Sequence, residues 1–367
     1  MSRQYAERNN PLLKNLDKWL GCPILYFLGI FHKKRKQPNS YKNIALIKTA
    51  AVGDTIVLSA MVAEIKKAIP KANITVICSK NNAAMVKTLS GIDKIEIFVM
   101  KSPYKSLQRI KSLGNYDLVL DFGPWPRING LIAWQLTADF KVGFYRPDTH
   151  RHYIYDCKVE HSDKLHEIEN YRNILRGAGI EPVGLLPDLR TNQRVRNDKY
   201  VVFHLFPGGA MDMQRRWLNE RWVELAGAIY RKYGTKILLS GGSADSEEAS
   251  QVCATLTAYG IPAESIAGKY SLADMASVLQ YAKLVVSVNT GIMHYAAAVG
   301  APLVAIHGAT SEVRWGPLSN NSVVVKSSPA CQPCISLGFE SNCTKPLCME
   351  NVTVNMVMSA VEKVLEA

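Results

Sequence analysis

The sequence lacks an apolar run long enough to cross a bilayer. Its most apolar early stretch, Trp19 to Phe31, has 13 mostly apolar residues, whereas a spanning helix needs about 20. Eighteen polar-rich residues precede this stretch, a strongly basic run follows it, and no Ala-x-Ala-like cleavage site is present. The stretch therefore favours neither a membrane-spanning helix nor an export signal.

Signals for sequence-specific nucleic-acid binding are also missing, because no zinc-finger spacing, RNP-type aromatic pattern or helix-turn-helix signal is present. Acidic residues are few: the 31 Asp and Glu residues are outnumbered by 44 Lys and Arg residues, which gives a formal net charge of +13. Such an excess favours an anionic partner, either an acidic membrane surface or a phosphorylated substrate. We expect no specific nucleic-acid partner.

Residues 1–40 form a segment that we expect to associate with an anionic membrane. Trp19, Tyr26 and Phe31 would lie at headgroup depth, and the basic run 33–36 would face anionic lipid. The alternative is a helix that packs on the domain or is buried in a dimer.

Eight cysteines are present, and half of them lie in a loop that we expect at residues 331–348. Without an export signal, a disulfide scaffold is not expected. A structural metal is one interpretation of the cluster, although its spacing matches a zinc ribbon poorly. The candidate ligands are Cys331, Cys334, Cys343 and Cys348.

Short apolar runs alternate with helical patterns from residue 43 onwards, as expected for a buried parallel sheet with helical crossovers. The pattern pauses at 179–200, which is rich in Pro, Gly and charge, and then restarts. We therefore predict an α/β protein of the GT-B fold, in which two Rossmann-like, doubly wound parallel-sheet domains, 41–185 and 186–367, face a central cleft. The second domain would carry the cysteine-rich loop and a C-terminal helix.

Ligands of doubly wound sheets bind at the carboxyl ends of the strands, which selects four segments. In the first, Lys48 ends a strand and Asp54 begins a helix. Asp54 could act as a general base, or it could simply cap the helix.

The other three segments lie in the second domain. The Gly208-Gly209 turn, with Arg215 after it, could bind phosphates, or it could be a solvated basic turn. Glu247 or Glu248 could accept hydrogen bonds from a ribose diol, or complement a helix dipole. The fourth segment supplies Asn289, Thr290, Gly291 and His294 at a strand-to-helix turn, where backbone N–H groups could bind an anion. His294 could equally be a core histidine.

Three motifs together resemble glycosyltransferase family 9, the ADP-heptose:lipopolysaccharide heptosyltransferases. They are "IKTAAVGDTIVLSA", the "PGGA" turn with its following "RRW", and "NTGIMHYAAAVGAP". The resemblance implies inverting, metal-independent transfer of a sugar from a nucleotide sugar, with ADP-heptose as the usual donor and no cofactor required for catalysis.

The resemblance also implies residue roles. Asp54 would be the catalytic base, and the donor would be bound by Lys48, Gly208, Gly209, Arg215, Glu247, Glu248, Asn289, Thr290, Gly291 and His294. Asn289 stands where the family usually has Asp, so a negative charge near the nucleotide is lost. Nucleotide sugars other than ADP-heptose therefore remain candidate donors.

The implied acceptor is a lipid-linked or lipopolysaccharide-type glycan, met at the cytoplasmic face of the inner membrane. Candidate acceptor residues in two loops of the first domain are Trp125, Arg127, Arg146 and Arg151. Two alternatives remain: the same fold acting on a protein acceptor, and a non-catalytic protein that binds nucleotide sugars.

Overall fold

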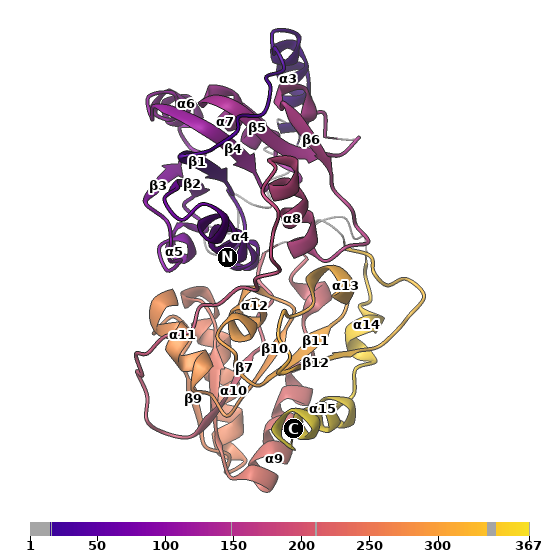
Figure 1. The fold of residues 1–367 in the computed structure, drawn as a ribbon. Coiled ribbons are helices and arrows are strands. Elements are labelled where there is room, and N and C mark those ends of the chain that lie inside the picture. The colour runs from indigo at the N-terminus through magenta and orange to yellow at the C-terminus, as the bar shows by residue number, and fades with distance from the viewer. Residues whose placement is uncertain (1–14, 16, 148, 210, 336–342, 367) are drawn as a thin grey trace. The chain divides into compact units, whose positions relative to one another are not determined.

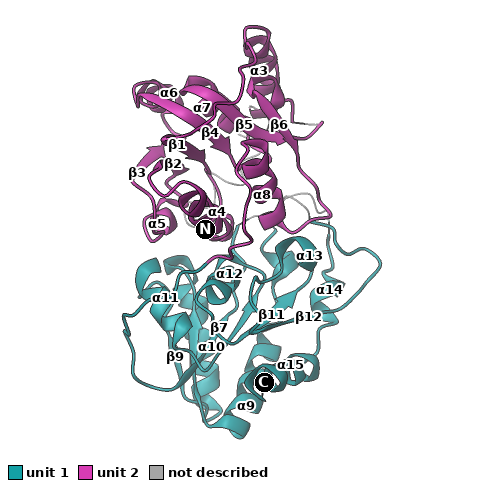
Figure 2. Ribbon diagram, viewed as in Figure 1, with its two compact units in different colours: residues 1–8, 188–367 teal, residues 9–187 magenta. Residues whose placement is uncertain are grey.

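The computed structural model describes residues 15, 17–147, 149–209, 211–335 and 343–366 (Figure 1). The chain divides into two compact units at Pro187/Asp188, within the segment expected to be the linker (Figure 2). Unit 2 precedes this boundary and unit 1 follows it. Each unit is a parallel sheet with helical crossovers, as the alternating pattern predicts.

Unit 2 has a six-stranded parallel sheet with the order β3-β2-β1-β4-β5-β6. The strands are β1 (Asn43–Ile47), β2 (Asn73–Ser79), β3 (Lys94–Phe98), β4 (Asn115–Asp121), β5 (Thr137–Tyr145) and β6 (Cys157–Glu160). The helices are α3 (Gly21–Ile30), α4 (Val52–Ala68), α5 (Ala83–Val86), α6 (Pro103–Lys111), α7 (Arg127–Gln135) and α8 (Glu167–Gly177), with the 3₁₀ turn η1 (His152–Ile154). The strand order reverses between β1 and β4, and such a switch point is where doubly wound sheets bind ligands.

Unit 1 repeats the plan with the order β12-β11-β10-β7-β8-β9, again entirely parallel. The strands are β7 (Tyr200–His204), β8 (Lys236–Ser240), β9 (Ala263–Ser265), β10 (Leu284–Val288), β11 (Leu303–His307) and β12 (Ser322–Lys326). The helices are α9 (Asn219–Tyr233), α10 (Ser246–Ala258), α11 (Leu272–Gln280), α12 (Gly291–Ala298), α13 (Glu312–Trp315), α14 (Leu347–Glu350) and α15 (Val354–Glu366), with turns η2 (Met213–Arg215) and η3 (Ser243–Asp245). Its switch point lies between β7 and β10.

Helix α3 packs against α7 and η1 of unit 2 (Figure 1). Leu25 is fully buried in a core cluster that includes Ile132 and Ile154. Two glycines allow the close approach: an added Cβ at Gly21 would lie 2.8 Å from the Arg127 Cβ, and one at Gly29 would lie 2.4 Å from the Tyr153 Cβ. The packed-helix interpretation of this segment is therefore correct for its inner face. No helix in the described ranges is long and apolar enough to span a membrane.

Candidate active site

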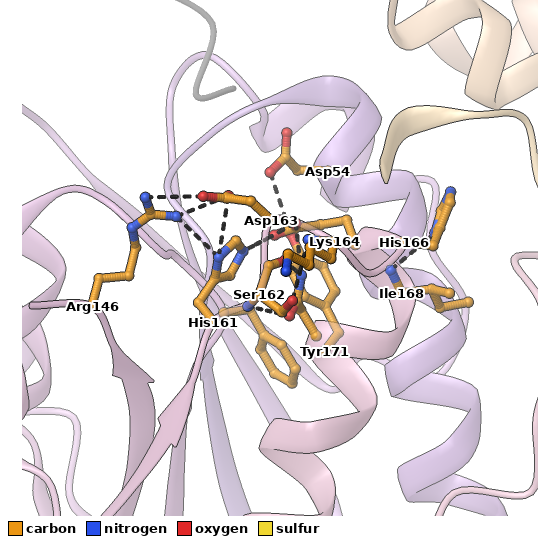
Figure 3. Close-up of polar contacts among 12 residues, drawn as sticks. Asp54, Arg146, His161, Ser162, Asp163, Lys164, His166, Ile168 and Tyr171 are labelled. Carbon is orange, nitrogen blue, oxygen red and sulfur yellow. Dashed lines mark hydrogen bonds and ion pairs between the residues drawn. The ribbon is translucent and has the colours of Figure 1, made fainter. Parts of the chain in front are cut away.

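Asp54 lies in the first turn of α4, beside the switch point of unit 2. The N-cap position of α4 is occupied by Ala51, and the Asp54 carboxylate turns instead to Lys48 and Tyr171. Its Oδ1 accepts a hydrogen bond from the Lys48 ammonium at 2.6 Å. The same oxygen accepts one from the Tyr171 hydroxyl at 3.3 Å (Figure 3). The Asp54 side chain keeps 21% of its surface exposed. Asp54 is thus a partly exposed, charge-paired carboxylate, and it does not serve as the helix cap.

Lys48 follows β1, and its side chain is only 2% exposed. A buried ammonium needs a counterion and hydrogen-bond acceptors, and it has both in the Asp54 carboxylate and the Phe122 carbonyl oxygen, 3.1 Å away. Its Nζ also lies 5.0 Å from the centre of the Tyr171 ring. In unit 2, Lys48 therefore fixes where the Asp54 carboxylate stands.

Two buried asparagines hold the backbone between Lys48 and α4. Asn82 donates to the Lys48 carbonyl oxygen and the Thr55 hydroxyl, both at 2.9 Å. Asn129 accepts from the Thr49 hydroxyl at 2.7 Å and donates to Asp121 at 3.1 Å. Sequence reasoning missed both asparagines and Tyr171, because their partners between Lys48 and Thr55 are 27 to 117 residues away and no local spacing marks them.

Two of the four expected acceptor residues are buried. The Arg127 side chain is 1% exposed; it pairs with Asp17 and donates to the Cys22 thiol. The Arg151 side chain is fully buried and pairs with Asp121. Burial lowers the pKa of Arg151, but Asp121, Tyr155 and Asp17 together raise it above its ordinary value. From the sequence we expect these two guanidinium groups to face a ligand, and their burial does not fit that expectation. Trp125, the third candidate, stacks on Arg127: its ring centre lies 5.2 Å from the guanidinium carbon.

Arg146 is different, because it follows β5 at the same sheet edge as Asp54 and its side chain is 16% exposed. It pairs with Asp163 at 3.0 Å and lies 3.2 Å from Nδ1 of His161 (Figure 3). Nε2 of His161 in turn lies 3.1 Å from the buried Glu167 carboxylate. Asp163 and His161 thus orient the guanidinium, and Glu167 in turn orients the His161 ring.

In unit 1, Arg215 connects the loops that follow β7 and β10. Gly208 and Gly209 adopt left-handed φ values of 63° and 77°, which only glycine takes without strain. The Arg215 guanidinium donates to the Gly208 carbonyl oxygen and, at 3.4 Å, to that of Asn289. The structure therefore brings three of the expected donor residues together at the switch point of this sheet.

The two candidate ribose-binding acids differ in their surroundings. Glu247 is exposed, and no hydrogen bond or ion pair of its side chain is found among the described residues. Glu248 accepts from the Arg216 guanidinium at 2.7 and 2.8 Å, and Arg216 also pairs with Asp212 at 2.7 Å. Glu248 is therefore the acid joined to the segment that carries Arg215.

Asn289 fits its surroundings as an amide. Its Nδ2 lies 2.6 Å from the Thr310 hydroxyl and 3.2 Å from Nδ1 of His307. Burial lowers the pKa of His307 to about 4, so at neutral pH the ring is uncharged and can accept the amide proton. The neighbouring Thr290 caps α12 by accepting from the Ile292 N–H at 3.0 Å.

Gly291 begins α12, and His294 lies on its second turn, buried with its ring against Trp315 at 6.3 Å. His294 is therefore packed among other side chains, at the same edge of the unit 1 sheet as Thr290 and Gly291.

The four cysteines of the 331–348 loop form no disulfide. Cys331 is exposed and Cys348 is buried, and burial, together with the three other thiols, raises the pKa of Cys348 to about 11. In the part of the chain that is described, no three His, Cys, Asp or Glu side chains are arranged to hold a metal ion. The metal site stays a prediction that this geometry does not support.

Two doubly wound parallel-sheet units, each with its candidate residues at the switch point, are the architecture of the GT-B class, to which many glycosyltransferases belong. A sequence model of glycosyltransferase family 9 (heptosyltransferase) matches residues 107–343, so the chain belongs to that family. The family resemblance and the GT-B fold expected from the sequence are both confirmed.

Relatives and solved structures agree with this assignment. Lipopolysaccharide heptosyltransferase 1 of Pseudomonas aeruginosa is 24% identical over 363 residues, covering 88% of this chain and 98% of the relative. The E. coli heptosyltransferase WaaC with ADP has a TM-score of 0.72 at 20% identity, covering 88% of this chain and 99% of that one. E. coli ADP-heptose lps heptosyltransferase II has a TM-score of 0.70 at 18% identity, covering 88% and 98%.

We predict that buried histidines make stability depend on pH. Burial lowers the pKa of His204 and His307 from 6.5 to about 4, so the unfolded chain binds more protons than the folded one between these values. The free energy of unfolding should therefore be highest above pH 6.5 and fall as pH drops towards 4, by up to about 3 kcal/mol for each histidine. Urea titrations at pH 7.5 and 4.5 measure this loss.

The matched variants are His204→Gln, which should remove part of the pH dependence, and His150→Gln at an exposed histidine, which should leave it unchanged. Equal pH dependence in the wild type and both variants would contradict the prediction.

Proposed function

We propose that the protein is an inverting glycosyltransferase that transfers a heptose from ADP-heptose to a lipopolysaccharide core or related glycan. The observation that carries the proposal is the Asp54 carboxylate, held by Lys48 and Tyr171 at the switch point of unit 2. A relative named as a lipopolysaccharide heptosyltransferase matches this chain over 98% of its own length, and a solved heptosyltransferase of similar fold contains ADP.

In this mechanism Asp54 removes the proton from the acceptor hydroxyl as the oxygen attacks the anomeric carbon. Both described contacts of Asp54 use Oδ1, so Oδ2 is the oxygen that meets the hydroxyl. The leaving diphosphate gains negative charge, which Arg215 and the N-terminus of α12 at Thr290 and Gly291 stabilise. Glu248 would accept hydrogen bonds from the ribose. Because these groups carry positive charge to the diphosphate, we propose that transfer needs no metal.

Among the candidate acceptor residues, we assign the contact with a phosphorylated glycan to Arg146. Its guanidinium lies at the Asp54 edge of the sheet, and its partner Asp163 is 48% exposed. A phosphate carries more charge than a carboxylate and can replace Asp163 on the same guanidinium fork. Arg127 and Arg151 are buried and take structural roles.

We also propose that α3 and its flanks bind the cytoplasmic face of an anionic membrane. The inner face of α3 is buried, whereas Trp19, Phe27, Ile30 and Phe31 are each 59–73% exposed. Exposed lysines flank this apolar face at Lys18, Lys33, Lys34 and Lys36. An apolar face bordered by positive charge is complementary to an anionic bilayer, and a lipid-linked acceptor would be found there.

Replacing Asp54 tests the catalytic assignment. Asp54→Asn should lower kcat for heptose transfer by about 10²–10⁴-fold, because general-base catalysis is lost, with little change in donor KM. The measurement is product formation from ADP-heptose in EDTA, beside UDP- and GDP-sugars. Asp139→Asn, at an exposed carboxylate of the same unit, should behave as wild type.

If the wild type prefers a UDP- or GDP-sugar, the assigned donor changes, but the proposed mechanism stays the same. Donor binding without turnover in the wild type would favour the non-catalytic alternative, and full activity of Asp54→Asn would remove Asp54 from the chemistry.

Replacing Arg146 tests the acceptor assignment. Arg146→Gln should raise the KM for a phosphorylated acceptor by about tenfold, because each lost charge-assisted pair weakens binding by about 1.5 kcal/mol or more. Donor hydrolysis without acceptor should stay within about twofold of wild type. Arg109→Gln, at a 71% exposed arginine on α6, is the control. An unchanged acceptor KM would exclude Arg146.

Vesicle binding tests the membrane surface. Phe27→Glu should abolish cosedimentation with anionic vesicles, and the triple replacement of Lys33, Lys34 and Lys36 by Gln should weaken it by about 1 kcal/mol per lysine. Tyr104→Glu, at a 71% exposed tyrosine on α6, should bind as wild type. If Phe27→Glu instead converts a dimer into a monomer and vesicle binding is absent, the surface belongs to a second copy of the chain.

A further inference from the structure

Helix α7 begins without a cap of its own. Its N-cap residue is Pro126, which has no side-chain acceptor, so the first backbone N–H groups of the helix need an acceptor from elsewhere. Asp17 supplies it from 110 residues away: Oδ2 accepts from the Arg127 N–H at 3.2 Å and Oδ1 from the Ile128 N–H at 3.1 Å. The same carboxylate pairs with the Arg127 guanidinium.

Asp17 is itself held in place by the helix that follows it. Leu25 of α3 is buried in the core, and Gly21 lies against the Arg127 side chain. The cap is therefore delivered by an anchored helix, and its carboxylate, only 22% exposed, is largely shielded from water.

Helix α7 in turn carries Asn129, the residue directly after the two capped N–H groups. Asn129 accepts from the Thr49 hydroxyl in the loop that leads to Asp54, and donates to Asp121 at the end of β4. Asp121 also accepts from the Gly123 N–H and the Tyr155 hydroxyl, so this side of the loop rests on one buried polar network. The start of α7 thus sets the position of the group that holds Thr49.

We propose that Asp17 is a positioning residue for the catalytic loop, acting through the start of α7 and Asn129. The inference rests on the proposed role of Asp54, and it makes the N-terminal segment part of the catalytic architecture as well as a candidate membrane surface. Asp17 does not contact Asp54; it fixes the helix whose Asn129 holds the loop between Lys48 and Asp54.

The first test is hydrogen exchange of full-length protein without any substrate. In Asp17→Ala the peptides covering residues 48–56 should exchange faster than in wild type, because Thr49 loses a fixed partner. The matched control is Asp93→Ala, since Asp93 likewise accepts from a backbone N–H, that of Ile74, and pairs with Lys66, but has no connection to α7. Faster exchange at 48–56 in both variants, or in neither, would overturn the proposal.

The second test is kinetic. Asp17→Ala should lower kcat by about tenfold, since small displacements of a catalytic group are costly, while donor KM stays within about twofold. Asp17→Asn keeps an acceptor oxygen and should lie between Asp17→Ala and wild type. A kcat loss in Asp93→Ala equal to that in Asp17→Ala, at a similar loss of Tm, would reduce the effect to general destabilisation.

The third test asks whether Asn129 transmits the effect. In an Asn129→Ala background, Asp17→Ala should lower kcat by less than about twofold, because coupled residues are not additive. An undiminished tenfold loss there would contradict the route through Asn129. If wild type transfers no sugar from any donor, the proposed function fails, and the exchange experiment still decides the role of Asp17.

Discussion

The ion pair between the buried Lys48 ammonium and the partly exposed Asp54 carboxylate constrains the end of β1 and the start of α4. An ammonium group that is 2% exposed is stable only if a carboxylate and further acceptors surround it, so the strand end, the helix start and the Phe122 carbonyl must converge. Asn82 and Asn129 hold the connecting loop from two sides, and Tyr171 reaches the same carboxylate from α8. Removing the Asp54 charge would leave the Lys48 ammonium buried without a counterion.

This arrangement also suits the proposed chemistry. Lys48 and Tyr171 both approach Oδ1, so the carboxylate is oriented, while no hydrogen bond found among the described residues uses Oδ2. A base that is fixed before the substrate arrives needs no reorganisation during the reaction. In unit 1, Arg215 plays a comparable organising part by bonding to the carbonyl oxygens of two loops, at Gly208 and Asn289. Asn289 in turn suits its neutral neighbour His307, so the amide at this position matches its local structure.

The sequence pattern reveals elements whose residues are buried on both faces, and it fails where burial is partial. Strands such as β1 and β10 are continuous apolar runs, which the sequence pattern marks clearly. Strand β5 carries Asp139 and Lys141, the edge strands β6 and β9 are short, and the edge strand β12 is only partly buried, so the periodic signal misses them. The candidate site divides in the same way: Lys48 and Asp54 are marked by the strand-to-helix turn, whereas Tyr171 and Asn129 are brought in by tertiary packing.

The arginines show the same limit for function. Arg127, Arg146 and Arg151 look alike in sequence, as cations in loops of the first domain, and only their partners separate them. Arg127 and Arg151 are compensated by buried or half-buried carboxylates, Asp17 and Asp121, whereas the Asp163 partner of Arg146 is half exposed. A carboxylate in water can be exchanged for a phosphate at small cost, but a buried one cannot leave without exposing an unpaired charge. The exposure of the counterion, more than that of the arginine, therefore distinguishes a binding residue from a structural one.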